Sequence, residues 1–168
     1  MRRVSWSLVV AVLLAGSGSA SATEHAFKEV DFPTAGGIQA HADLYLPKKK
    51  VSTLIILFHQ AGWSRGEYRE IAPKLVAQGY QVLAVDQRSG NAVNGVPNET
   101  HRRANEKKAG TNYLDAYADL QAALKYATHR LKAKRIIVWG SSYSASLVFR
   151  LAAVNAFLRE SAPPDPPN

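Results

Sequence analysis

The segment Gly140-Ser141-Ser142-Tyr143-Ser144 has residue types and a spacing that could support nucleophilic catalysis. It stands between an apolar run over residues 135–139 and a helical pattern over residues 145–157. A Gly-x-Ser-x-small pattern between a strand and a helix is typical of a nucleophile elbow. Such a turn is sharp, so residues near the serine must be small to avoid clashes between strand and helix. The pattern therefore predicts Ser142 as the nucleophile.

Backbone N–H groups near this turn could stabilise an oxyanion formed by attack of Ser142. A helix that begins just after the serine directs free N–H groups and its positive dipole end at that spot, so the N–H of Tyr143 is the natural first donor. A second donor is expected from the loop after an earlier buried strand. The segment His59-Gln60-Ala61-Gly62 occupies that position. We expect the Ala61 N–H to serve, with Gln60 of the same loop as the less certain choice.

The elements that must position these residues follow from hydrophobic patterning. Weak alternation over residues 26–32 and 38–46, with a Gly-Gly turn between them, predicts an antiparallel hairpin at a sheet edge. Continuous apolar runs then predict buried strands, and helical spacing predicts helices between them. The strands are expected at 52–58, 81–85 and 135–139, the helices at 68–78, 113–128 and 145–157, and a long polar loop at 87–108. Alternating buried strands and helices predict an α/β fold with a mostly parallel sheet and flanking helices in three layers, α/β/α.

Three segments, each after a predicted buried strand, resemble the α/β-hydrolase superfamily in order and spacing: His59–Gly62, Ala84–Gly90 and Gly140–Ser146. The sequence is most similar to the dienelactone-hydrolase and prolyl-peptidase-like esterase branches, from Phe27 to about Ala153. The resemblance implies an eight-stranded, mostly parallel sheet and a Ser–His–acid triad. It also implies a serine hydrolase that acts on a carboxylic ester or a related small acyl substrate. The sequence departs from the family at Ser144 and Gln60, where many members have glycine.

The acid and the histidine of such a triad are missing. In this superfamily both follow the serine, but the only acids after Ser142 are Glu160 and Asp165, and no histidine follows it. By the same resemblance, Asp86 matches a residue that supports a strand-end loop and is not the usual triad acid. We therefore expect a truncated α/β-hydrolase, the N-terminal part only, whose sequence diverges from the family near residues 153–156. The strand over residues 135–139 would then form an exposed apolar edge that is prone to aggregation.

Two other functions remain open on the sequence. The chain could be a catalytically inactive fragment or a non-catalytic binding module on the hydrolase scaffold, because a serine without a base is a poor nucleophile. Alternatively, His59 or His101 could act as an improvised base for Ser142. The remaining histidines, His25, His41 and His129, are interpreted as surface or packing residues.

The two ends of the chain differ from the rest. Residues 1–22 have a positive start at Arg2 and Arg3, an apolar stretch and an Ala20-Ser21-Ala22 site, which together predict a cleaved signal peptide. A membrane anchor is the alternative, but the apolar run is shorter than the roughly 20 residues that a span needs. We expect a secreted or periplasmic protein with a hydrolase part at 23–157 and a solvated, proline-rich tail at 158–168.

Composition argues against several other classes of function. There are no cysteines, so the chain has no disulfides and no thiolate-held metal, and we expect neither a cofactor nor a metal. The formal net charge is +8, or +6 once Arg2 and Arg3 leave with the signal peptide (8 − 2). The basic residues are scattered and lack interleaved aromatic residues, so they are interpreted as solvated turns rather than as a nucleic-acid site. The expected partner is a small-molecule substrate, with no nucleic acid and no membrane after signal cleavage.

Overall fold

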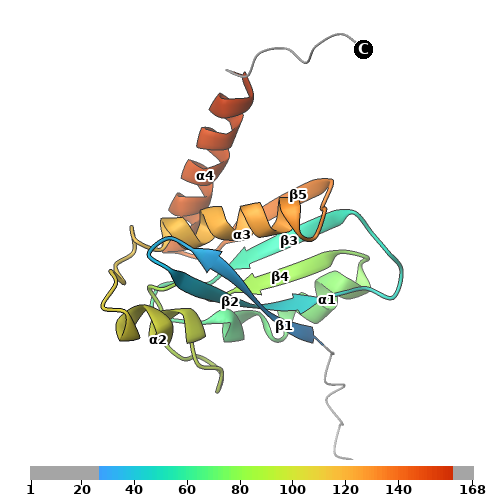
Figure 1. The fold of residues 1–168 in the computed structure, drawn as a ribbon. Helices are drawn as coiled ribbons and strands as arrows, with labels where there is room; N and C mark the ends of the chain where they lie inside the picture. Colours follow the sequence, from blue (N-terminus) through green and yellow to red (C-terminus); the bar gives the residue numbers. More distant parts are fainter. Residues whose placement is uncertain (1–26, 161–168) are drawn as a thin grey trace, which may run out of the picture.

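The computed structural model describes residues 27–160 (Figure 1). A five-stranded sheet forms its centre, in the order β1-β2-β4-β3-β5. The strands are β1 (Phe27–Thr34), β2 (Ile38–Tyr45), β3 (Thr53–Phe58), β4 (Gln81–Val85) and β5 (Arg135–Gly140). The pairs β3–β4 and β3–β5 are parallel, whereas β1–β2 and β2–β4 are antiparallel. The predicted N-terminal hairpin and the predicted α/β fold are both confirmed, and the described sheet is mixed, with two parallel and two antiparallel strand pairs.

The helices cover the two faces of this sheet. On one face lie the 3-10 turn η1 (Arg65–Tyr68) and helix α1 (Ile71–Ala77), and on the other lies α3 (Tyr117–His129). Helix α4 (Tyr143–Glu160) begins against α3 and then projects from the body of the molecule (Figure 1). Among the described residues, no helix combines the length and the apolar character needed to span a membrane.

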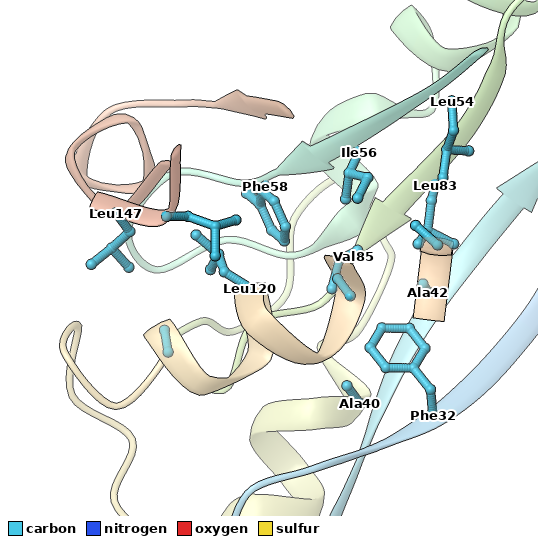
Figure 2. Close-up of a cluster of buried hydrophobic side chains, with 14 of the residues drawn as sticks. Phe32, Ala40, Ala42, Leu54, Ile56, Phe58, Leu83, Val85, Leu120 and Leu147 are labelled. Carbon is cyan, nitrogen blue, oxygen red and sulfur yellow. The ribbon is translucent and has the colours of Figure 1, made fainter. Parts of the chain in front are cut away.

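Alternation along the strands divides the core between these faces. On the α3 side, the even-numbered residues of β2 meet apolar side chains of β3, β4 and α3, and Leu147 of α4 closes one end (Figure 2). Tyr45 of β2 lies on the opposite face, in the smaller cluster under α1. β3 and β4 are buried on both faces because each has a neighbouring strand on both sides and helices above and below. These two strands therefore form a rigid base for the loops that follow them.

Two predicted elements need correction. The polar stretch at 87–108 is not a continuous loop, because it contains helix α2 (Glu99–Glu106), whose first turn is capped by the Asn98 side chain. The helix expected at 68–78 is interrupted, since η1 precedes a shorter α1. The predicted signal peptide at 1–22 lies outside the described residues, as does the predicted tail from residue 161 onward, while α4 continues to Glu160.

Candidate active site

Ser142 stands at the turn between β5 and α4, at the carboxyl end of the parallel strands. Its φ angle is +53°, in the left-handed region that non-glycine residues seldom adopt, and its side chain is exposed. Gly140 permits the turn, because a Cβ at this position would lie 2.5 Å from the carbonyl carbon of Ser144. Strand, turn and helix together therefore present the Ser142 hydroxyl to solvent on a strained backbone.

The loop after β3 lies directly beside this turn. Phe58 is the register partner of Gly140, and the Ser141 N–H donates to the Phe58 carbonyl oxygen at 3.0 Å. Residues 60–63 form a tight turn in which Gly62 has a φ of +74°. The structure thus brings the His59–Gly62 loop and the serine turn to one place at the sheet edge.

The three backbone donors predicted for an oxyanion are not equally available. The Gln60 N–H donates to the Glu67 carboxylate at 2.8 Å. Within residues 27–160, no hydrogen bond occupies the N–H of Ala61 or the N–H of Tyr143. The N–H groups of Ala61 and Tyr143 are therefore available as donors, whereas the N–H of Gln60 forms a bond within its own loop.

Ser144 has a structural role that its small size alone does not explain. Its side chain is fully buried, and its hydroxyl donates to the His59 carbonyl oxygen at 2.5 Å. The same hydroxyl accepts from the Gln87 side-chain amide at 3.0 Å. Ser144 therefore ties the first turn of α4 to the loops after β3 and β4. These contacts could not be predicted from the sequence, because a short polar residue in a tight turn can equally face solvent.

The side chain of Tyr143 is held away from the turn by a polar cluster. Its hydroxyl bonds with the Ser89 hydroxyl and accepts from the Gln87 amide at 2.8 Å. Its ring contacts that of Tyr113, with centroids 4.7 Å apart. Burial raises the pKa of the Tyr143 phenol, so it stays neutral at physiological pH. Gln87 and Ser89 lie at the start of the segment predicted as a long polar loop, and these contacts of theirs were not predicted from the sequence.

His59 is locked as a neutral structural residue. Its Nδ1 donates to the Gln60 carbonyl oxygen at 2.8 Å, and its Nε2 accepts from the Gln87 N–H at 2.9 Å. Burial lowers the pKa of His59 to about 4, because the charged imidazolium would lose its hydration. With no free lone pair, this imidazole cannot take the proton of Ser142.

His101 is also occupied at both nitrogens. Its Nδ1 donates to the Arg88 carbonyl oxygen at 2.6 Å, and its Nε2 accepts from the Asn105 amide at 2.8 Å. Across residues 27–160, no hydrogen bond joins the Ser142 hydroxyl to a histidine or a carboxylate. The geometry therefore gives no support to either histidine as an improvised base.

Asp86 occupies the loop-supporting position that its sequence context indicates. The carboxylate accepts from the Arg65 N–H at 2.7 Å, from the Arg65 guanidinium at 2.7 Å and from the Glu99 N–H at 2.8 Å. It thus joins the loop after β3, the end of β4 and the start of α2. All of its contacts are structural, and none is directed at Ser142.

The arrangement Glu29, His41 and Asp43 has the residue types of a metal site, with candidate ligand atoms within 4.8 Å of one another. The two carboxylate oxygens of Asp43 already face cations, however. Asp43 accepts from Arg65 Nε at 2.9 Å, and its second oxygen lies 3.1 Å from an Arg69 guanidinium nitrogen. This grouping is an ion-pair network that binds the hairpin to η1, and two guanidinium groups beside Asp43 disfavour a metal ion.

Comparison with known proteins agrees with this geometry. Residues 49–158 match the sequence model of a family described as serine aminopeptidase, S33. No curated protein sequence matches the chain.

Among solved structures, a thermostable carboxyl esterase from Bacillus coagulans is similar, with a TM-score of 0.63 and 19% identity over 78% of this chain and 41% of that one. An esterase from Pyrococcus furiosus has a TM-score of 0.57 and 24% identity over 75% of this chain and 46% of that one. An α/β hydrolase from Novosphingobium aromaticivorans has a TM-score of 0.56 and 15% identity over 77% and 40% of the two chains.

At these identities the solved structures show the fold alone, and the chain spans less than half of the length of each. The sequence model, in contrast, covers most of the chain, including the β3 loop, the serine turn and the start of α4. The chain therefore belongs to the serine aminopeptidase S33 family of α/β-hydrolases.

Proposed function

We propose that this chain carries the nucleophile and the oxyanion hole of a secreted serine hydrolase that acts on a carboxylic ester or a related small acyl substrate. One observation carries the proposal: the exposed Ser142, at a φ of +53°, directly precedes the free N–H of Tyr143, and its turn is bonded through Ser141 to Phe58, just before the loop that carries the free N–H of Ala61. Backbone donors at a helix start and at a neighbouring loop are the elements that acyl transfer needs around its nucleophile.

The chemistry would proceed through a tetrahedral intermediate. The Ser142 oxygen attacks the substrate carbonyl carbon, the carbonyl oxygen becomes an oxyanion, and the Ala61 and Tyr143 amides donate to it. A base must accept the hydroxyl proton, and an acid must orient that base. Because His59 and His101 are occupied, we propose that both groups come from sequence beyond this chain, which spans 40–46% of the length of the solved structures compared above.

The substrate class rests on the relatives. The family that matches this chain is described as serine aminopeptidase, and two of the similar solved structures are esterases. Amide and ester hydrolysis share the acyl-enzyme intermediate, so either bond fits the turn. The His59–Gly62 and Gly140–Ser146 motifs favour the dienelactone-hydrolase and prolyl-peptidase-like esterase branches, and we therefore propose an ester.

A fluorophosphonate probe tests the nucleophile. The protein is first extended with the downstream coding sequence, read in the frame that supplies the acid and the histidine of the triad. In this extended protein we expect covalent labelling at Ser142. Labelling should be lost in Ser142→Ala and kept in Ser141→Ala, which removes the neighbouring hydroxyl of the same turn. In the chain as given, labelling should be at least about 1,000-fold slower, because the proton acceptor is missing. An extended version that stays unlabelled, or that is labelled at Ser141, would contradict the proposal.

A second candidate has one observation in its favour: in residues 27–160, no base reaches Ser142. The chain as given would then be an inactive fragment or a binding module. Hydrolysis of p-nitrophenyl acetate distinguishes the two cases. A rate that Ser142→Ala leaves unchanged supports the inactive chain, whereas a rate that this substitution removes supports catalysis without the missing triad residues.

Secretion is a separate part of the proposal and rests on residues 1–22. N-terminal sequencing of the protein recovered from the periplasm or the medium should begin at Thr23. Recovery of the intact N-terminus in the cytoplasm would contradict export.

A further inference from the structure

Two connections that are distant in the sequence lie side by side at the amino ends of the parallel strands. The Lys134 N–H donates to the Ser52 carbonyl oxygen at 3.0 Å, and Thr53 pairs with Arg135 in the β3–β5 register. The β2–β3 connection carries three lysines, the segment that joins α3 to β5 carries three cations, and β5 begins with a fourth. We call this group the basic edge; it consists of Lys48–Lys50, Arg130, Lys132, Lys134 and Arg135, all exposed. The sequence places these residues in separate turns, and only the fold unites them.

The basic edge lacks compensating negative charge. No Asp or Glu occurs between residues 44 and 66 or between residues 120 and 159. Within the part of the chain that the structure describes, none of the seven cations forms an ion pair, whereas Arg65, Arg88 and Arg102 all do. The carboxyl end of α3 favours a cation at Arg130. That effect does not extend to Lys48–Lys50, which follow a strand.

The N-terminal segment joins the molecule at the same edge. β1 begins at Phe27, which pairs with Tyr45 at the end of β2, just before Leu46 and the lysines (Figure 1). Leu46 adds an exposed apolar side chain beside Lys48, with 54% of its surface accessible.

We propose that the basic edge docks on the anionic phospholipid surface of a membrane. Each lysine or arginine near such a surface contributes to binding, and the contribution falls away within a Debye length. A nucleic acid is the less suitable polyanion, because the edge lacks aromatic side chains on which bases could stack. This inference departs from the sequence-based expectation of no membrane partner, because only the fold gathers these cations at one edge. It extends beyond the hydrolase function and does not depend on it.

The proposed orientation is compatible with the serine site. Ser142 follows the carboxyl end of β5, whereas the basic edge includes the residues at its amino end. Docking of the basic edge would therefore direct the Ser142 turn away from the lipid. Substrate would reach the turn from the aqueous side, and the membrane would only retain the protein at its surface.

Vesicle co-sedimentation tests the proposal with the full chain. Vesicles containing phosphatidylglycerol and phosphatidylcholine are compared with vesicles of phosphatidylcholine alone, so that any apolar insertion of the N-terminal segment is common to both. The test variant is Lys132→Gln/Lys134→Gln. The matched control is Lys107→Gln/Lys108→Gln, which removes the same charge after α2 from residues that are also exposed. Each pair includes one lysine with a positive φ, +55° at Lys132 and +52° at Lys108.

We expect stronger binding to the anionic vesicles than to the neutral ones, with affinity for the anionic vesicles about 30-fold weaker in the test variant and nearly unchanged in the control. Binding should also weaken steeply as salt rises. Circular dichroism confirms that both variants are folded. Absence of binding, an equal loss in both variants, or equal binding to neutral vesicles would overturn the proposal. Binding to duplex DNA as strong as to the anionic vesicles, at the same salt, would overturn the lipid assignment and show a general polyanion surface.

Discussion

The Ser144 hydroxyl connects the first turn of α4 with two loops that approach from neighbouring strands. The hydroxyl is buried, and both partners are polar groups that water does not reach. A buried hydrogen bond of this kind stabilises modestly when made, but the partners carry a larger cost when left unpaired. The residue therefore affects how rigidly the oxyanion loop is held beside Ser142.

The substitution Ser144→Ala should lower the free energy of unfolding by about 1–3 kcal/mol, because it leaves the His59 carbonyl without this donor. Urea unfolding followed by circular dichroism measures the change. The control is Ser146→Ala, on the exposed side of the same helix, which should change the free energy by less than about 0.5 kcal/mol. Equal effects of the two substitutions would show that the bonds of Ser144 contribute nothing to stability.

His59 should make stability depend on pH in a defined window. Burial lowers its pKa to about 4 from the ordinary 6.5, so between these values the unfolded chain binds a proton that the folded chain does not. The free energy of unfolding should therefore be independent of His59 above pH 6.5. It should fall as pH decreases towards 4, by roughly 3 kcal/mol in total.

Unfolding of the parent chain, His59→Gln and His129→Gln at pH 7.0 and 4.5 isolates this effect. The parent and His129→Gln should lose stability in parallel, since His129 is exposed. His59→Gln should lose roughly 2–3 kcal/mol less over the same range. An identical pH dependence in all three proteins would mean that His59 titrates normally in the folded state.

At the scale of elements, β5 differs from the strands beside it. It forms an edge of the described sheet, and its residues alternate between a packed face and an open face. Ile136 and Val138 pack on the main core, whereas Ile137 and Trp139 remain 36% and 44% exposed. A hollow of about 280 Å³ lies between this strand and α4. An apolar, unpaired strand edge of this kind promotes association between chains.

The substitutions Ile137→Lys and Ile136→Lys test this asymmetry on adjacent residues. Ile137→Lys should reduce aggregation during heating and change the free energy of unfolding by less than about 0.5–1 kcal/mol. Ile136→Lys should destabilise the fold by several kcal/mol, because it buries a charge in the core. Light scattering and urea unfolding give the two readouts. If Ile137→Lys aggregates as much as the parent chain, the open face of β5 is not the surface that associates.

The sequence predicts the strands, most helices and the serine turn because these depend on local patterns: apolar runs, helical spacing and small residues at a sharp turn. α2 was missed because its residues are mostly polar and only Thr100 and Ala104 are buried, so Ala104 is the only apolar residue available to mark a helical spacing. The contacts of Ser144, Gln87 and His59 could not be predicted either. They join segments 28 to 85 residues apart, and the partner of a polar side chain depends on the tertiary fold.

At the scale of the whole molecule, the described part has two hydrophobic core clusters, and one is covered by helices more fully than the other. The cluster under α1 is covered, and β3 and β4 have paired neighbours on both sides. The cluster under α3 extends to Leu147 and Leu151 of α4, but the neighbouring side chains of this helix contribute little to it. Phe149 is 77% exposed, and Ala152, Ala153 and Val154 also face solvent. Stability should therefore decrease from the centre of the sheet towards α4.

Amide hydrogen exchange should show this gradient directly. The amides of β3 and β4 should exchange only through global unfolding, because two neighbouring strands and buried side chains protect them. Those of β5 should exchange faster, since this strand pairs on one side only. Those of residues 152–154 in α4 should exchange fastest, because their side chains face solvent and fraying there costs little free energy. Mass spectrometry of peptides from each element measures the rates. Slow exchange through residue 154 would show that another surface, such as a second copy of the chain, covers α4 in solution, and it should then disappear on dilution.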